Sequence, residues 1–218
     1  MTDESLIREV DDEVRQDEYK KLWDRYGTSL SGLVFLVVAA VAGFQGYKYY
    51  QQTQAEEASI VYSDAVKKAN AGKYDDALSA LAVVKHAGFG QLAKMREAAV
   101  LADKGDIDKA AAVYDAVALD SATDPALADL ARIRGGYLLV DKVTPDQLLT
   151  KLGKFDKEGS DWRFAAREIF GLSAFRTKDF VMADRYMNAI FVDPDAPQAM
   201  KQRAQVMLQL IAPDLPKK

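Results

Sequence analysis

Cysteine is absent from these 218 residues, and histidine occurs only once. Without cysteine the chain forms no disulfide and no thiolate metal site, and a single histidine excludes most zinc sites. That histidine, His86, lies near a helix end, where we expect a capping or solvated role rather than catalysis. Gly88 and Gly90 are interpreted as a helix break, and no glycine-rich phosphate loop occurs. The sequence therefore predicts no catalytic residue, no cofactor and no metal site.

Charged side chains are missing from residues 26–47, a run centred on Leu-Val-Phe-Leu-Val-Val-Ala-Ala-Val-Ala. At about 1.5 Å per residue, a helix of this length crosses the ~30 Å hydrocarbon core of a bilayer. A cleaved signal peptide would have a basic start, a shorter apolar segment and a cleavage site of small residues. Here the leader is long and acidic, and Lys-Tyr-Tyr-Gln-Gln follows the run. We therefore predict a retained transmembrane helix over residues 28–49.

Basic and aromatic residues flank this run on both sides. Four lysines and arginines lie within residues 15–25, whereas after Lys48 the next basic residue is Lys67. Because basic residues near a span mark its cytoplasmic side, we predict that residues 1–27 are cytoplasmic and that residues 50–218 are periplasmic, in a bacterial inner membrane. The expected anchors at the membrane interfaces are Trp23, Arg25, Tyr26, Tyr47, Lys48, Tyr49 and Tyr50.

Small residues recur along the span at a spacing of four. Such pairs let two helices approach closely in lipid, although glycine and alanine are also common in any membrane helix. Contact with a partner helix, a second copy of the chain included, therefore stays open beside plain contact with lipid. The pairs are Thr28 and Gly32, Ala39 and Gly43, and Ala42 and Gly46.

The formal net charge of −4 lies entirely in residues 1–27, which hold nine acidic and five basic residues. The rest of the chain is neutral and is therefore a poor match for nucleic acid. The leader places apolar residues at helical spacing, which favours an amphipathic helix. Docking on a cytoplasmic partner, pairing with its own kind and a solvated tail all remain open. The apolar positions are Leu6, Ile7, Val10, Val14 and Leu22.

Helical periodicity continues from residue 54 onward, with breaks at Gly, Asp and Pro and no useful alternating run. The pattern predicts an all-α domain of nine helices, each of about 12–18 residues. Their expected starts are Ala55, Tyr74, Gly90, Ile107, Pro125, Pro145, Asp161, Phe180 and Pro197. The expected N-caps are Asp106, Asp124, Thr144, Asp179 and Ala196, and Pro125, Pro145 and Pro197 suit first-turn positions.

Three segments share a polar turn, a bulky residue and an alanine three residues later. The bulky residue fixes the start of a second helix, and the alanine lets the first helix approach. A period near 34 residues then predicts a degenerate fourth unit at residues 142–148. The repeat-defining residues are Tyr74 and Ala77, Ile107 and Ala110, and Phe180 and Ala183.

These helix–turn–helix units resemble the tetratricopeptide repeat, and Asp193-Pro194 matches its closing proline. The Trp and Leu-Gly of the repeat's first helix are mostly missing, and the third segment lacks its glycine. The resemblance implies an α-solenoid of four helix pairs with a capping helix at about 197–211, which leaves a concave face for partners. Most aromatics of the C-terminal half are expected in the core, with one or two lining the groove: Trp162, Phe164, Phe170, Phe175 and Tyr186.

The whole layout resembles the family of ancillary subunits of the bacterial SecYEG translocon. The leader Ile-Arg-Glu-Val-Asp-Asp-Glu-Val-Arg-Gln-Asp-Glu-Tyr-Lys-Lys-Leu-Trp-Asp-Arg-Tyr-Gly (7–27) is similar to its alphaproteobacterial form. The resemblance implies an inner-membrane protein that works beside the translocon with a membrane-anchored periplasmic chaperone and helps newly exported proteins. It brings no catalytic residue with it.

Two functions follow from the residues and the resemblance together. The first is a non-enzymatic scaffold that holds a periplasmic chaperone or exported clients near the translocon. The alternative is a self-associating scaffold for envelope assembly or cell division, built on the leader and the small residues of the span.

Overall fold

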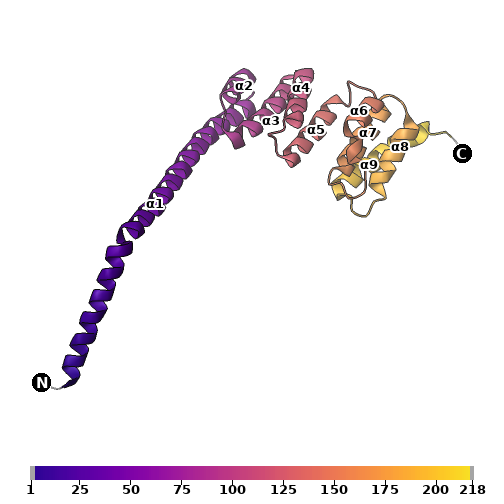
Figure 1. Cartoon of the computed structure of the whole chain (residues 1–218). Coiled ribbons are helices and arrows are strands. Elements are labelled where there is room, and N and C mark those ends of the chain that lie inside the picture. Colours follow the sequence, from indigo (N-terminus) through magenta and orange to yellow (C-terminus); the bar gives the residue numbers. More distant parts are fainter. Residues whose placement is uncertain (1–2, 217–218) are drawn as a thin grey trace. The chain divides into compact units, whose positions relative to one another are not determined.

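Every regular element that the structure describes is helical. The computed structural model describes the backbone of residues 3–216 and the side chains of residues 20, 23–86 and 88–216. Within this range no strand occurs, so the all-α class predicted from the sequence is confirmed. The helices are α1 (Asp3–Asn70), α2 (Tyr74–Ala82), α3 (Ala87–Lys104), α4 (Ile107–Leu119), α5 (Pro125–Leu139), α6 (Pro145–Leu152), α7 (Arg163–Arg176), α8 (Phe180–Phe191) and α9 (Gln198–Ile211), with short 3₁₀ turns at Gly153–Phe155 and Ala212–Asp214 (Figure 1).

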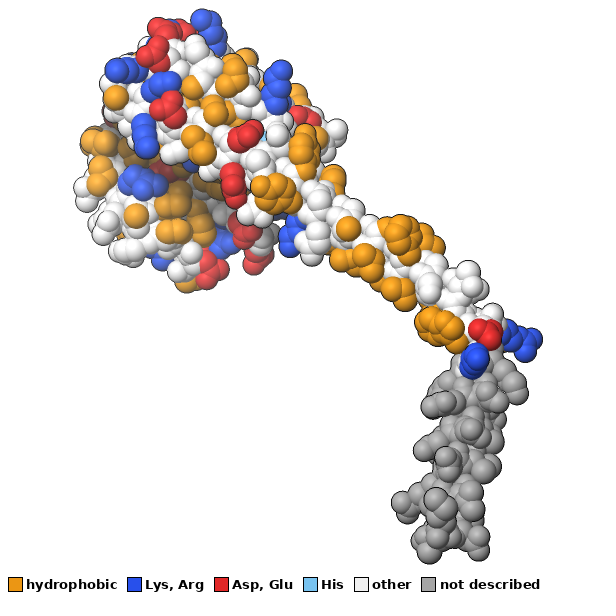
Figure 2. All heavy atoms as spheres, turned by 90° about the vertical axis from the view of Figure 1, so that its left-hand side faces the viewer, with side chains coloured by type: hydrophobic (Ala, Val, Ile, Leu, Met, Phe, Trp, Pro, Cys, Tyr) orange, Lys and Arg blue, Asp and Glu red, His pale blue; other side chains and the backbone are white. Residues whose placement is uncertain are grey.

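The chain divides into two units, residues 1–56 and residues 57–218. In the first unit, the described part of α1 includes a stretch long and apolar enough to cross a membrane. Its side chains are exposed, among them Trp23 and Tyr47. Figure 2 shows hydrophobic side chains along this helix, with charged ones next to the grey residues. The apolar side chains expected to form one face of the leader (Leu6, Ile7, Val10, Val14 and Leu22) lie outside the described residues.

A new helix does not begin at Ala55, as the periodicity predicted. Instead α1 runs without a break from the apolar stretch to Asn70. No glycine or proline lies between Gly46 and Asn70 to end the helix. Before Ala55, side-chain hydrogen bonds link successive turns of α1, since Gln51 donates to the Tyr47 hydroxyl at 2.9 Å and Thr53 donates to the Tyr49 carbonyl at 3.1 Å.

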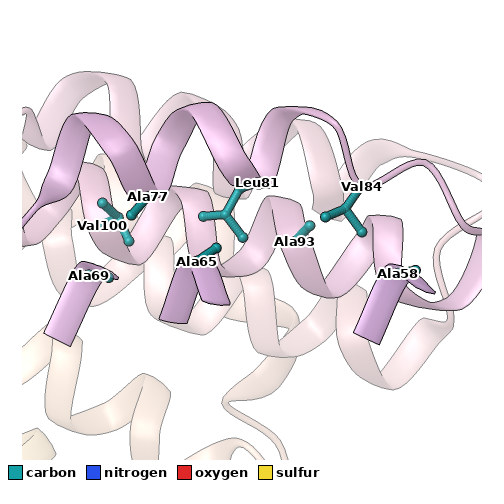
Figure 3. Packing of buried hydrophobic residues seen from close by; sticks show 8 residues of the cluster. All are labelled: Ala58, Ala65, Ala69, Ala77, Leu81, Val84, Ala93 and Val100. Atoms are coloured by element: carbon teal, nitrogen blue, oxygen red, sulfur yellow. The ribbon is translucent and has the colours of Figure 1, made fainter. Parts of the chain in front are cut away.

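The second unit consists of helix pairs followed by one further helix. The last turns of α1 pair with α2, and three more pairs follow before α9. The three repeat-defining alanines (Ala77, Ala110 and Ala183) are fully buried at 0% exposure, as the repeat pattern predicted. Figure 3 shows the first core, in which small side chains of α1, α2 and α3 point toward one another, including Ala65, Ala77 and Ala93. Small residues thus set how closely the helices of a pair approach.

In the other pairs the second helix supplies the small residue at the contact. In the third pair, α5 and α6, the first helix supplies it and the second helix supplies large side chains. Helix α6 carries Leu148 and Leu152 in its buried positions instead of alanine. The small residues lie on α5, where a Cβ added to Gly136 would stand 2.5 Å from Leu152 Cδ1 and 3.1 Å from Ile169 Cδ1. The glycine pair at 135–136 lies inside α5, and a side chain at its second member would displace the buried Leu152.

Three turns between the helices of a pair use one left-handed residue each. Gly72 and Gly105 have φ values of 73° and 93°, and Lys178 occupies the same place, two residues before Phe180, with φ 64°. The missing glycine of the third segment is thus replaced by a lysine in a conformation that costs a side-chain-bearing residue about 1–2 kcal/mol.

Several helix boundaries differ from the sequence-based expectation by a few residues. Helix α3 begins at Ala87 rather than Gly90, so Gly88 and Gly90 lie in its first turn and are not a break. Helix α7 begins at Arg163 rather than Asp161. Helices α2 and α6 have nine and eight residues, fewer than the expected 12–18.

The predicted N-caps are confirmed at Asp124, Thr144 and Asp179, whose side chains accept backbone N–H groups. Thr144 also forms a capping box with Gln147. Asp106 occupies its N-cap position without a side-chain bond, since its carboxylate instead pairs with Lys109 at 3.2 Å. Ala196 does not cap α9. Pro197 is itself the N-cap there, one residue before its expected place, whereas Pro125 and Pro145 occupy the first turns of α5 and α6.

Replacing Lys178 with glycine will stabilise the second unit. Lys178→Gly removes the strain of the left-handed conformation, and the greater freedom of glycine in the unfolded chain offsets part of this gain. We expect the free energy of unfolding to rise by about 0.5–1 kcal/mol, measured by urea unfolding of the full chain in detergent micelles. Lys178→Ala is the control and will give no comparable gain, because it keeps the strained backbone. A glycine variant no more stable than the alanine variant contradicts the prediction.

Candidate functional site: a groove between α5, α7 and α9

An open groove of about 850 Å³ lies between the first helices of the last two pairs and the C-terminal helix. In a solenoid such first helices form the face on which partners bind. Three of its walls come from separate parts of the chain: Tyr137 from α5, Glu168 and Leu172 from α7, and Ala199, Gln202, Arg203, Val206 and Met207 from α9.

Glu168 is the one charged side chain of the groove that is buried, with 6% of its surface exposed. It lies on α7 among buried apolar residues such as Ile169 and Phe170. A buried carboxylate is costly unless it is paired and hydrogen-bonded. Arg203 donates Nε–H to Glu168 Oε1 at 2.6 Å and Nη2–H to Oε2 at 3.1 Å, and the Tyr137 hydroxyl donates to Oε2 at 2.5 Å. These bonds join α5, α7 and α9 at one point.

The carboxylate also changes the acidity of its partners. Burial raises the pKa of the Tyr137 hydroxyl well above its ordinary value of 10.0, and the hydrogen bond to Glu168 raises it further. The hydrogen bond from Arg203 to Glu168 likewise raises the pKa of the Arg203 guanidinium. At neutral pH the Tyr137 phenol therefore keeps its proton and the Arg203 guanidinium keeps its charge.

The rest of the groove is apolar and accessible. Leu172 and Met207 are half-buried, whereas Val206 is 56% exposed. Leu210 follows one turn after Val206 on α9 and is 54% exposed. A last helix of a solenoid normally turns a polar face to solvent, so an exposed aliphatic pair on α9 is unusual. The arrangement provides an apolar surface with one cationic group, which suits binding rather than chemistry.

The residues singled out from the sequence lie elsewhere. The repeat-defining alanines belong to the cores. Most of the C-terminal aromatics were expected in the core, and Phe164, Phe170 and Tyr186 are indeed buried. His86 caps α3, where its Nδ1 accepts the Gly88 N–H at 3.3 Å, so the capping role is confirmed. None of the described aromatics from that set lines the groove. Its aromatic is Tyr137 instead.

Sequence reasoning missed Tyr137, Glu168 and Arg203. One signal was available, because Glu168 lies four residues after Phe164 and four before Leu172, so helical spacing places it on the same face of α7 as two apolar side chains. Its two partners lie 31 and 35 residues away in sequence, close to the repeat period, and nothing in the local sequence of either points to it.

A second concentration of charge lies where α7 meets the segment between α8 and α9. Arg167 pairs with Asp156 at 2.7 Å, and Arg163 pairs with Asp193 at 3.5 Å and with Asp195 at 3.1 Å. These carboxylates are therefore occupied by arginines. Among the described residues no group of three His, Cys, Asp or Glu side chains is placed to hold a metal ion.

The residues predicted at the membrane interfaces and at helix contacts all lie on α1. Tyr26, Tyr49 and Tyr50 are exposed, as are the small residues of the three spaced pairs. A Cβ added at Gly32, Gly43 or Gly46 would meet nothing within 4 Å, so no part of the described chain packs there. Their roles in lipid and in helix contacts stay predictions.

Helix pairs with buried alanines and an accessible groove define the protein as a tetratricopeptide-like α-solenoid. The chain belongs to the tetratricopeptide repeat-like domain family, whose sequence profile matches residues 20–176. Among curated proteins it is similar to the ancillary SecYEG translocon subunit of Escherichia coli (strain K12). The two are 28% identical over 154 residues, which cover 70% of this chain and 73% of the relative. The two matches confirm the resemblances seen in the sequence, to the tetratricopeptide repeat and to the ancillary subunits of the SecYEG translocon. No solved structure matches the chain significantly.

Removing Arg203 will destabilise the second unit, because it leaves the buried Glu168 carboxylate without its cation. We expect Arg203→Ala to lower the free energy of unfolding by about 2 kcal/mol, since Arg203 itself is half exposed. Urea unfolding of the full chain in detergent measures the change.

The double variant Arg203→Ala with Glu168→Gln will recover part of this loss, because glutamine carries no charge to leave unpaired. Gln205→Ala, an exposed position on the same helix, is the control and will change stability by less than about 0.5 kcal/mol. If Arg203→Ala and Gln205→Ala change the free energy of unfolding equally, the ion pair between Arg203 on α9 and Glu168 on α7 does not stabilise the protein.

The raised pKa of Tyr137 makes stability depend on pH in the alkaline range. The folded chain keeps the phenol proton that the unfolded chain releases near its ordinary pKa of 10.0. This contribution to stability is therefore complete below pH 10 and is lost as pH rises above it. Because the chain has ten tyrosines, the measurement is the difference in unfolding free energy between the wild type and Tyr137→Phe from pH 8 to 11. The wild type will lose more stability above pH 10, and parallel curves exclude a raised pKa at this residue.

Proposed function

We propose that the protein is a non-enzymatic scaffold that α1 anchors in the inner membrane and that works beside the SecYEG translocon. The similarity to a curated ancillary SecYEG translocon subunit, over most of both chains, carries this proposal. The apolar stretch of α1 supports the membrane anchor.

The groove supports a binding role for the second unit. It joins exposed apolar side chains of α9 to an ion pair whose polar groups are already satisfied, which leaves no obvious nucleophile or base for chemistry. In repeat proteins such a surface holds a segment of another protein. A periplasmic chaperone and newly exported chains are the partners that the family resemblance implies.

The proposed orientation places the second unit in the periplasm. It rests on the basic residues that precede the span, because lysine and arginine are retained on the cytoplasmic side. The lack of cysteine suits an oxidising compartment, in which free thiols react.

Single introduced cysteines test orientation and partners together, because the chain has no cysteine of its own. The positions are Val206→Cys in the groove, Tyr50→Cys just after the span and Val181→Cys as an exposed control on α8. A membrane-impermeant thiol reagent that carries a photocrosslinker is added to spheroplasts. We expect all three to be labelled, and Val206→Cys or Tyr50→Cys to crosslink to a translocon or chaperone subunit that mass spectrometry identifies. The control will give no such product.

Two results contradict the proposal separately. No labelling at any position in intact spheroplasts, with labelling after lysis, reverses the orientation. Labelling without a crosslink to a translocon or chaperone subunit from either Val206→Cys or Tyr50→Cys rejects the scaffold at the translocon.

A further inference from the structure

The three helices that form the groove carry an excess of positive charge that the rest of the chain does not share. Beyond the leader the chain is neutral, with 24 basic and 24 acidic residues. Helices α5, α7 and α9 together hold seven basic residues and two acidic ones, and α9 has no acidic residue. The basic residues are Arg132, Arg134, Arg163, Arg167, Arg176, Lys201 and Arg203. Three of them are neutralised by nearby carboxylates, because Arg132 pairs with Asp129 and because Arg163 and Arg167 pair with aspartates outside these helices.

The two acidic residues of these helices are both engaged within the chain. Asp129 pairs with Arg132 at 2.8 Å and with Lys154 at 2.7 Å, and buried Glu168 pairs with Arg203. Since the Glu168 side chain is 8% exposed and that of Arg203 is 55% exposed, an approaching molecule meets the guanidinium and not the carboxylate. The pair is neutral, yet its accessible side is cationic.

Arg134 adds a second cation on the same side of the groove. It lies three residues before Tyr137 on α5, so the two side chains share one helix face, and it is exposed. Among the described side chains no carboxylate lies within ion-pair distance of Arg134. On α7, Arg176 follows one turn after Leu172 and donates to the carbonyls of Val140 and Val143, which keeps its charge at that end of the face.

The apolar part of the groove lies between these cations. Val206 and Leu210 on α9 stand one turn apart and are each more than half exposed, and Leu172 lies opposite on α7. With 14 residues, α9 is about 21 Å long, so the surface accommodates a segment of three to four helical turns. A ligand that covers the surface needs an apolar face and carboxylates along its edges.

We propose that the groove binds an acidic amphipathic segment of a partner protein, with its apolar face on Val206 and Leu172 and its carboxylates toward Arg134 and Arg203. This rests on the proposed scaffold function and adds the chemistry of the segment that is held. The exposed arginines make the groove prefer acidic segments to basic ones. The apolar contacts stabilise the binding of both kinds of segment.

Two labelled peptides of 15 residues test the preference for acidic segments. Both carry the same leucine face, and their flanking positions are glutamate in one and lysine in the other. Fluorescence anisotropy measures their binding to the full chain in a non-ionic detergent. We expect the acidic peptide to bind about tenfold more tightly at low salt, from a few exposed charge pairs. The preference will fall below about twofold in 1 M salt, where the screening length is about 3 Å.

Variants then assign the preference to the groove. Arg134→Ala will reduce binding of the acidic peptide severalfold and leave the basic one unchanged, whereas Val206→Asp will weaken both. Gln205→Ala, exposed on α9 outside the groove lining, is the control and will change neither. Arg134 pairs with no carboxylate among the described side chains, so this variant separates recognition from stability.

Equal binding of the two peptides, tighter binding of the basic one, or binding that Val206→Asp leaves intact overturns the inference. A fall in the mass of the free protein on Val206→Asp also overturns it, since the groove would then be an interface between copies. Failure here is distinguishable from failure of the scaffold function. Crosslinks from Val206→Cys to a translocon or chaperone subunit together with equal peptide affinities would retain the scaffold and reject only the acidic preference.

Discussion

Close approach of paired helices at a residue without a large side chain is the constraint on which the solenoid depends. Ala77, Ala110 and Ala183 are fully buried, and a larger side chain at any of them would force the pair apart. In the third pair the small residue moves to the other helix, where Gly136 receives Leu152. Each pair therefore needs a small residue at the contact between its two helices, and either helix can provide that residue. This explains why the third repeat is hard to recognise in sequence and yet folds as a pair.

The groove lies between α9 and the first helices of the two pairs that precede it. Each pair covers the apolar face of the one before it, but nothing within the described residues covers the outer side of α9. Helix α9 packs on α8 and α7, where Ala204 and Ile211 join Met187 and Ala174 in one core, and the ion pair of Arg203 with Glu168 adds a polar contact to α7. The ion pair therefore joins α9 to α7 at the wall of the groove, beside this apolar core. The same pair keeps a cation accessible, which links the stability of the last helix to recognition.

Sequence reasoning succeeded where the signal is local. Thr144 and Asp124 cap their helices as expected, because a cap depends on residues within one turn. It failed at Ala55, since nothing local ends α1 there and only packing of Ala58 onward against α2 and α3 makes that stretch part of a repeat. It also failed for Glu168. A carboxylate on an apolar face is a visible anomaly, but Tyr137 and Arg203 reach it across a full repeat.

By itself the sequence determined that the chain is helical, that one stretch of α1 is apolar enough for a membrane, and that helix pairs recur with alanine at their contacts. These properties follow from composition and from spacing within a few turns. Only the tertiary structure decided that Glu168, Tyr137 and Arg203 meet, and that Val206 and Leu210 face outward beside them. Such contacts arise from residues about 30 or more positions apart, whose proximity depends on how the helix pairs stack and not on any local preference.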